Sequence, residues 1–127
     1  MATLVVGLGG ALGAVARYWS TEWVRAMAGD ALPWGTFAVN VVGSFALGFL
    51  LVWLHSMAPS AQARQFLAIG FLGSFTTFST FSHELVELTR AGELLRAGGY
   101  AAVSVAVGVA AVVLGAWVAG VMVQARN

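Results

Sequence analysis

The fold is decided by the stretch GFLGSFTTFSTFS, which runs from Gly70 to Ser82. From Ser74 to Ser82, six hydroxyl side chains alternate with three phenylalanines inside an otherwise apolar segment. One hydroxyl can bond back to a carbonyl one turn earlier, but six exceed that need. Because Gly70 and Gly73 flank the run, we expect the helix to be broken or unwound there, although a continuous helix with an unusually polar face is the alternative. Broken backbone at membrane depth is tolerated where it is buried in protein, lines a cavity or coordinates an ion, so the stretch predicts a site.

The composition around this stretch is that of an integral membrane protein. The 127 residues are 60% hydrophobic and 9% charged, with a mean hydropathy of +0.88, which lies outside the range of soluble domains. The net charge of +1 gives no basic field that would attract a nucleic acid. The chain has no cysteine, and it shows no Ser/His/Asp constellation, metal-ligand spacing or phosphate-binding loop. We therefore expect no enzyme and no nucleic-acid partner.

Four stretches are long and apolar enough to cross a bilayer core of roughly 30 Å. Short polar turns separate them, and together they form one all-α domain over residues 1–127 that leaves no segment for a soluble core. The predicted spans are Ala2 to Trp23, Trp34 to His55, Phe66 to Leu88, with its break, and Leu94 to Val123.

An even number of spans puts both termini on one side of the membrane, so the arginines on each face can be counted. Four arginines lie on one face, against two arginines and the terminal amine on the other. The bias is small, and a chain without an orientation preference can insert both ways round. The arginine count is therefore compatible with an antiparallel homodimer of dual topology. Close helix approach is provided by three small-residue pairs: Gly9 with Gly13, Ser44 with Gly48, and Ala111 with Gly115.

Two further polar tracks accompany the hydroxyl run. Thr36, Asn40 and Ser44 follow one face of the second span, and Tyr100, Ser104 and Gly108 repeat that spacing in the fourth. Asn40 is deep enough to need a partner, and bonding across helices as packing glue is one open interpretation. The other is that the tracks and the hydroxyl run line a narrow path.

The side chains along this path suit an anion. They offer amide, hydroxyl and phenol donors and the electropositive edges of phenylalanine rings, with no carboxylate in the middle. Arg17 would add positive potential in a vestibule at the mouth of the path, or would snorkel to the interface. The remaining ionisable residues near helix ends are expected to be solvated; they are His55, His83, Glu84 and Glu87.

Motifs in three of the spans carry a family resemblance. The first span has Gly9-Gly10, Gly13 and Arg17-Tyr18; the second has Gly35-Thr36, Val39-Asn40 and Gly43-Ser44; the third has Gly70, Gly73 and the block from Thr76 to Ser82. With these motifs in this order, the chain resembles the Fluc/CrcB fluoride channels over its whole length.

The resemblance implies an antiparallel homodimer with two fluoride pores in the bacterial plasma membrane, through which passive export gives resistance to fluoride. It makes Phe78 and Phe81 the rings that face the ion, and it makes Asn40 a donor to fluoride or a support for those rings. The hydroxyl track implied by the family comprises Ser79, Thr80, Tyr100 and Ser104.

The resemblance also implies a structural sodium ion at the dimer interface, held by backbone carbonyls at Gly73 and Thr76. The sequence departs from the family at two positions: Gly108 stands where relatives often carry serine, and Ser74 replaces a second glycine.

Two other classes of function are open. A proton-coupled antiporter of the small multidrug type would need an acid within the first span, where no acid precedes Glu22. A non-transporting assembly protein would not need the hydroxyl run.

Overall fold

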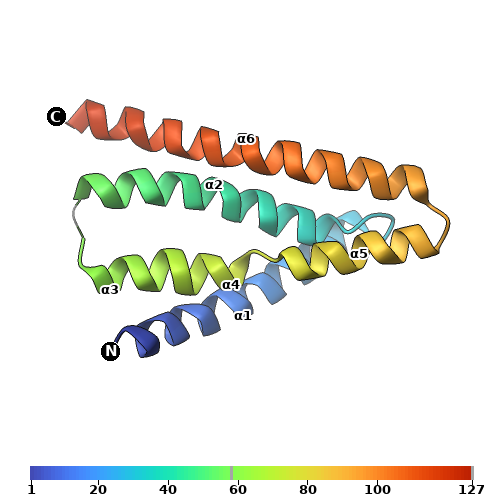
Figure 1. Cartoon of the computed structure of the whole chain (residues 1–127), viewed down its shortest axis with the longest axis horizontal. Coiled ribbons are helices and arrows are strands. Elements are labelled where there is room, and N and C mark those ends of the chain that lie inside the picture. Colours follow the sequence, from blue (N-terminus) through green and yellow to red (C-terminus); the bar gives the residue numbers. More distant parts are fainter. Residues whose placement is uncertain (58, 127) are drawn as a thin grey trace.

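The computed structural model describes residues 1–57 and 59–126, in which every regular element is a helix (Figure 1). The predicted turn from Met57 to Arg64 includes residue 58, which lies outside the described residues. Three helices are long, and the third segment is divided into four short pieces. The elements are α1 (Ala2–Ala28), α2 (Trp34–Met57), α3 (Ala61–Arg64), the π-helix η1 (Gln65–Leu72), α4 (Gly73–Phe75), α5 (Phe78–Arg90) and α6 (Leu94–Arg126).

Three helices in the described part of the chain, α1, α2 and α6, are long and apolar enough to cross a membrane. Their 27, 24 and 33 residues correspond to roughly 36–50 Å of helix, which exceeds a hydrocarbon core of roughly 30 Å. The helices therefore continue a turn or so past the predicted apolar spans. The predicted span from Phe66 to Leu88 is not one helix, because the chain changes from π-helix to α-helix within it and then breaks.

The predicted break is present, but it lies further along the chain than the flanking glycines. Gly73 is helical, with φ −62° and ψ −30°, whereas Thr76 and Thr77 are extended. Gly70 is needed for close approach: a Cβ there would lie 2.7 Å from the carbonyl oxygen of Val6 in α1. Glycine lets η1 pack against α1, and the unwinding occurs at two threonines.

The packing brings the third segment against α1, and α2 against α6. Both α2 and α6 run from right to left in Figure 1, and both termini lie at the same end of the bundle, as predicted. The small residues that the sequence offers for close helix approach are used within one chain. A side chain on Gly13 would overlap the carbonyl oxygen of Phe71, one on Gly48 that of Val112, and one on Gly115 that of Phe45.

These contacts predict that alanine substitutions at two glycines of α6 have very different effects on stability. Gly115→Ala places a methyl group against the backbone of α2 and is expected to lower the free energy of unfolding by about 1–3 kcal/mol. Gly120→Ala meets no atom within 4 Å and is expected to leave stability unchanged or to raise it by up to about 1 kcal/mol. Thermal unfolding of both variants in detergent provides the measurement, and equal melting temperatures would contradict the packing described here.

Candidate functional site

The centre of the candidate site is the break between α4 and α5, where Asn40 of α2 binds the backbone of Thr77. The Thr77 N–H donates to Asn40 Oδ1 at 2.8 Å, and Asn40 Nδ2 donates to the Thr77 carbonyl at 3.0 Å. The amide thus replaces both hydrogen bonds that Thr77 would make inside a continuous helix. Asn40 does bond across helices, as one interpretation of the sequence held, and it retains a second N–H that these contacts do not use.

The side chain of Thr77 starts the helix again. Its hydroxyl oxygen accepts a hydrogen bond from the Thr80 backbone N–H at 3.2 Å, which makes Thr77 the N-cap of α5. The same hydroxyl donates to Thr80 Oγ1 at 3.0 Å and lies 3.3 Å from Ser79 Oγ. Ser79 and Thr80 are themselves exposed at the surface of the single chain.

The six hydroxyls of the run therefore have different roles. Thr76 and Ser82 bond back to carbonyls four residues earlier, at 3.1 and 2.9 Å, which is the ordinary behaviour of a hydroxyl in an apolar helix. Ser74 faces α1, where a Cβ on Gly10 would lie 3.1 Å from its oxygen. Only the central three, Thr77, Ser79 and Thr80, form a network at the break.

The diverted amides leave two carbonyl groups without their helical donors. The Gly73 carbonyl would be paired with the N–H of Thr77, which binds Asn40 instead. The Thr76 carbonyl would be paired with the N–H of Thr80, which binds the Thr77 hydroxyl. Unwound backbone carbonyls are the ligands that coordinate sodium in discontinuous membrane helices, so the chemistry of this pair fits the ion implied by the resemblance.

Phe78 and Phe81 have very different surroundings. Phe81 is 8% exposed and packs against Tyr100, with ring centroids 5.2 Å apart and planes tilted by 59°. The Phe78 ring lies 5.8 Å from that of Phe81, but Phe78 is 78% exposed. The rings form a series that leads from Tyr100 inside the bundle to an uncovered phenylalanine at its surface.

The two predicted polar tracks face each other across α2 and α6. A Cβ on Gly108 would lie 3.8 Å from Ser44 Oγ, and Thr36 and Tyr100 meet at a common partner described below. Ser104 Oγ is buried and has no hydrogen-bond partner among the described residues. The tracks lie side by side because the two helices run parallel and repeat the same four-residue spacing. A serine side chain at position 108, which the resemblance led us to expect, would face Ser44.

Glu84 was predicted to be a solvated residue near a helix end, and this prediction was wrong. It is half-buried, and both carboxylate oxygens accept hydrogen bonds, from Thr36 Oγ1 at 2.5 Å and Tyr100 Oη at 2.8 Å. Glu84 joins α2, α5 and α6 through these contacts. Its position three residues after Phe81 places it on the same helical face, and this spacing is the signal that could have revealed it.

Two hollows adjoin these groups. One of about 610 Å³ lies beside the turn that precedes α2, and its lining includes Arg25, Glu84 and Arg96. The other, of about 270 Å³, lies at the break, and its lining includes Asn40, Ser44, Gly73, Thr76 and Phe78. Arg17 lines neither hollow; it is half-buried within α1, so its role in a vestibule stays a prediction.

Comparison with known proteins gives consistent matches. The sequence profile of the family described as "CrcB-like protein, Camphor Resistance (CrcB)" matches residues 4–116. The chain is 48% identical over 118 residues to the fluoride-specific ion channel FluC of Hyphomonas neptunium, covering 91% of this chain and 93% of the relative. It is 44% identical to the FluC of Rhizobium johnstonii (88% and 90% covered) and 45% identical to that of Hydrogenovibrio crunogenus (90% and 87% covered).

The contacts of Glu84 predict a stability difference between two acidic residues of α5. Glu84→Ala leaves the Thr36 and Tyr100 hydroxyls, in side chains 2% and 7% exposed, without their acceptor, so unfolding should become easier by about 1–3 kcal/mol. Glu84→Gln keeps one oxygen acceptor and should therefore lower the free energy of unfolding by less than Glu84→Ala does.

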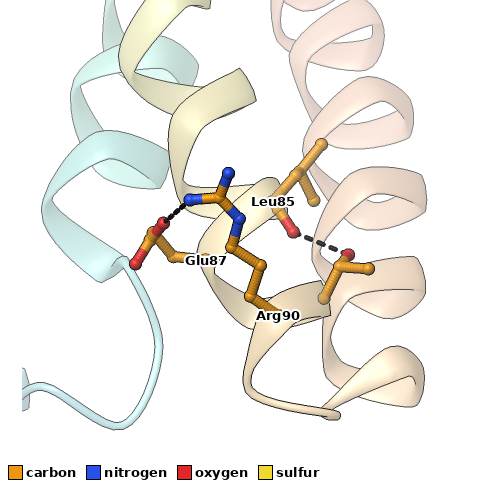
Figure 2. A network of polar contacts seen from close by, with 4 residues as sticks. Leu85, Glu87 and Arg90 are labelled. Atoms are coloured by element: carbon orange, nitrogen blue, oxygen red, sulfur yellow. Dashed lines mark hydrogen bonds and ion pairs between the residues drawn. The ribbon is translucent and has the colours of Figure 1, made fainter.

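Glu87, three residues along, provides the matched control. It makes a surface ion pair with Arg90 at 3.3 Å, beside the bond from Thr89 to the Leu85 carbonyl (Figure 2). Glu87→Ala is expected to change stability by about 0–1 kcal/mol. Thermal unfolding in detergent checks both residues, and a Glu84→Ala variant no less stable than Glu87→Ala would rule out the structural role of Glu84.

Proposed function

This chain belongs to the CrcB family of membrane proteins, and from that premise we propose that it is a fluoride-specific ion channel. The observation that carries the proposal is the similarity to curated relatives named as fluoride-specific channels, which covers about nine-tenths of this chain. A channel lets the ion flow down its gradient and transforms no substrate, so the chain is not an enzyme. Passive outward flow would protect the cell from accumulated fluoride.

The free donors near the break support an anion path. Moving a small anion into a medium of low dielectric has an idealised cost of order 20 kcal/mol, so many donors in series must replace its water. Thr36 and Tyr100 already donate to Glu84. Among the described residues, the donors that remain without an acceptor include the second N–H of Asn40 and the hydroxyls of Ser44, Thr80 and Ser104. We propose that fluoride passes these groups and the ring edges of Phe78 and Phe81.

We further propose that the third segment, from η1 to α5, is a fourth membrane span. The break, its free carbonyls and the hollow beside it would then lie at membrane depth, where irregular backbone must be covered by protein. Phe78, 78% exposed in the single chain, lines the same hollow. A second copy of the chain could cover this face, and the nearly balanced arginine count supports an antiparallel pair. Two-fold symmetry would give two equivalent paths.

The same arrangement supports the proposed sodium ion. Gly73 and Thr76 both line the hollow at the break, and we propose that their carbonyl groups, from both subunits, hold the ion. When bound, sodium would supply the positive charge that stabilises these carbonyls away from water. Because the matched relatives named above come from bacteria, we place the protein in the bacterial plasma membrane as a multi-pass protein.

The antiporter alternative has no support in the first helix. Such transporters need an acidic group within the membrane, whereas Glu22 of α1 pairs with Arg25 at 3.0 Å near the end of that helix, and both side chains are substantially exposed.

The central test is ion efflux from proteoliposomes that contain the purified protein. Fluoride release, recorded with a fluoride electrode, is expected to be fast, while chloride release in parallel vesicles stays at the level of protein-free liposomes. Release of neither ion by an intact dimer would contradict channel activity and favour an assembly protein without transport.

The ring assignments predict slower passage in two variants. Phe78→Ile and Phe81→Ile keep an apolar side chain but remove the electropositive ring edge, so fluoride efflux should slow in each variant while the dimer stays folded. Efflux and size-exclusion chromatography together provide the measurement. Unchanged flux in both variants would exclude these rings from the path.

A further inference from the structure

Thr77 uses every hydrogen-bonding group that it possesses. Its backbone N–H and carbonyl both bind Asn40. Its hydroxyl oxygen accepts from the Thr80 N–H, and its hydroxyl hydrogen goes to Thr80 Oγ1. The side chain is 7% exposed. Thr77 therefore has no free donor to offer a passing ion, although it lies at the centre of the break.

The direction of these hydrogen bonds determines whether the neighbouring hydroxyls of Ser79 and Thr80 can donate to an ion. A hydroxyl carries one hydrogen and two lone pairs. Since the Thr77 hydrogen goes to Thr80, the contact with Ser79 at 3.3 Å must be one in which Ser79 donates. The hydrogen of Ser79 is then occupied and points back at Thr77. Thr80 accepts instead of donating within the network, so its own hydroxyl hydrogen has no acceptor among the described residues.

We propose that Thr77 is a positioning residue for fluoride passage, which turns the hydroxyl hydrogen of Thr80 outward as a donor and holds that of Ser79 inward. The inference rests on the proposed channel function and deepens it. It gives the two adjacent hydroxyls of the track different roles, with Thr80 as the donor to the anion and Ser79 as a fixed support. Thr80 is exposed in the single chain, so its hydrogen is available to an ion at this face.

The decisive variants are Thr77→Val, which keeps the shape and the β-branch that suit extended backbone, and Thr77→Ser, which restores the hydroxyl. Thr77→Val should slow fluoride efflux about tenfold or more, the effect of one hydrogen bond to a charged group. Thr77→Ser should restore the rate to within about twofold of the original chain. Thr89→Val, which removes a hydroxyl that only bonds back to the Leu85 carbonyl, is the matched control in the same helix and should have the original rate.

A double-mutant comparison separates positioning from general structural damage. If Thr77 acts through Thr80, then Thr77→Val should have little further effect in a Thr80→Val background. The inference would be overturned if the fold-reductions in fluoride efflux of the two single variants multiply in the double variant. It would also be overturned if Thr77→Val conducts fluoride like the original chain.

Amide hydrogen exchange keeps the test independent of conduction. The Thr80 N–H, which donates to the Thr77 hydroxyl, should exchange faster in Thr77→Val than in the original chain, and Thr89→Val should not share this effect. Absence of fluoride flux in the original chain would refute the proposed function, and exchange at Thr80 would still decide the role of Thr77. Unchanged exchange in Thr77→Val would refute that role even in a conducting protein.

Discussion

The interrupted third segment depends on the pair of hydrogen bonds between Asn40 and the backbone of Thr77. A peptide unit taken out of a helix in apolar surroundings must recover both its donor and its acceptor, or bear a cost of about 1–3 kcal/mol for each buried group left unpaired. A primary amide can supply both partners at once, and Asn40 does so at 2.8 and 3.0 Å. That exchange frees the Gly73 carbonyl, while the hydroxyl of the same Thr77 starts α5, frees the Thr76 carbonyl and forms the hydroxyl network.

Close backbone contact holds the elements on which this exchange relies. Gly9, Gly13 and Gly70 bring α1 against η1, and Gly48 and Gly115 bring α2 against α6. With no side chains between these backbones, the helices have little freedom to slide, so Asn40 stays opposite Thr77 and Glu84 stays within reach of Thr36 and Tyr100. The polar groups are positioned by apolar packing, which is consistent with a membrane interior that offers them no water.

The sequence predicts the features that depend on local composition and fails on those that depend on distant partners. Apolar length predicts α1, α2 and α6, and the hydroxyl run predicts an interruption. The interruption lies within the predicted run, but its exact position at Thr76 and Thr77 depends on Asn40, which is 37 residues from Thr77 and which the flanking glycines do not reveal. Nothing in the sequence indicates the π-helix that precedes the break. Glu84 was missed because its partners lie 48 and 16 residues away, while its neighbours in the chain resemble an ordinary polar helix end.

The parallel arrangement of α2 and α6 has a consequence for how such chains can diverge. Their two polar tracks are kept in register by glycine contacts along the helices, whereas the turn at residues 91–93 joins α6 to α5 and not to α2. Turns of this kind tolerate insertions at small thermodynamic cost. One residue inserted inside α6 between Tyr100 and Gly115 would instead rotate part of that track by about 100°. Evolution is therefore free to lengthen the turns of this fold, while the count of residues along its paired helices stays fixed.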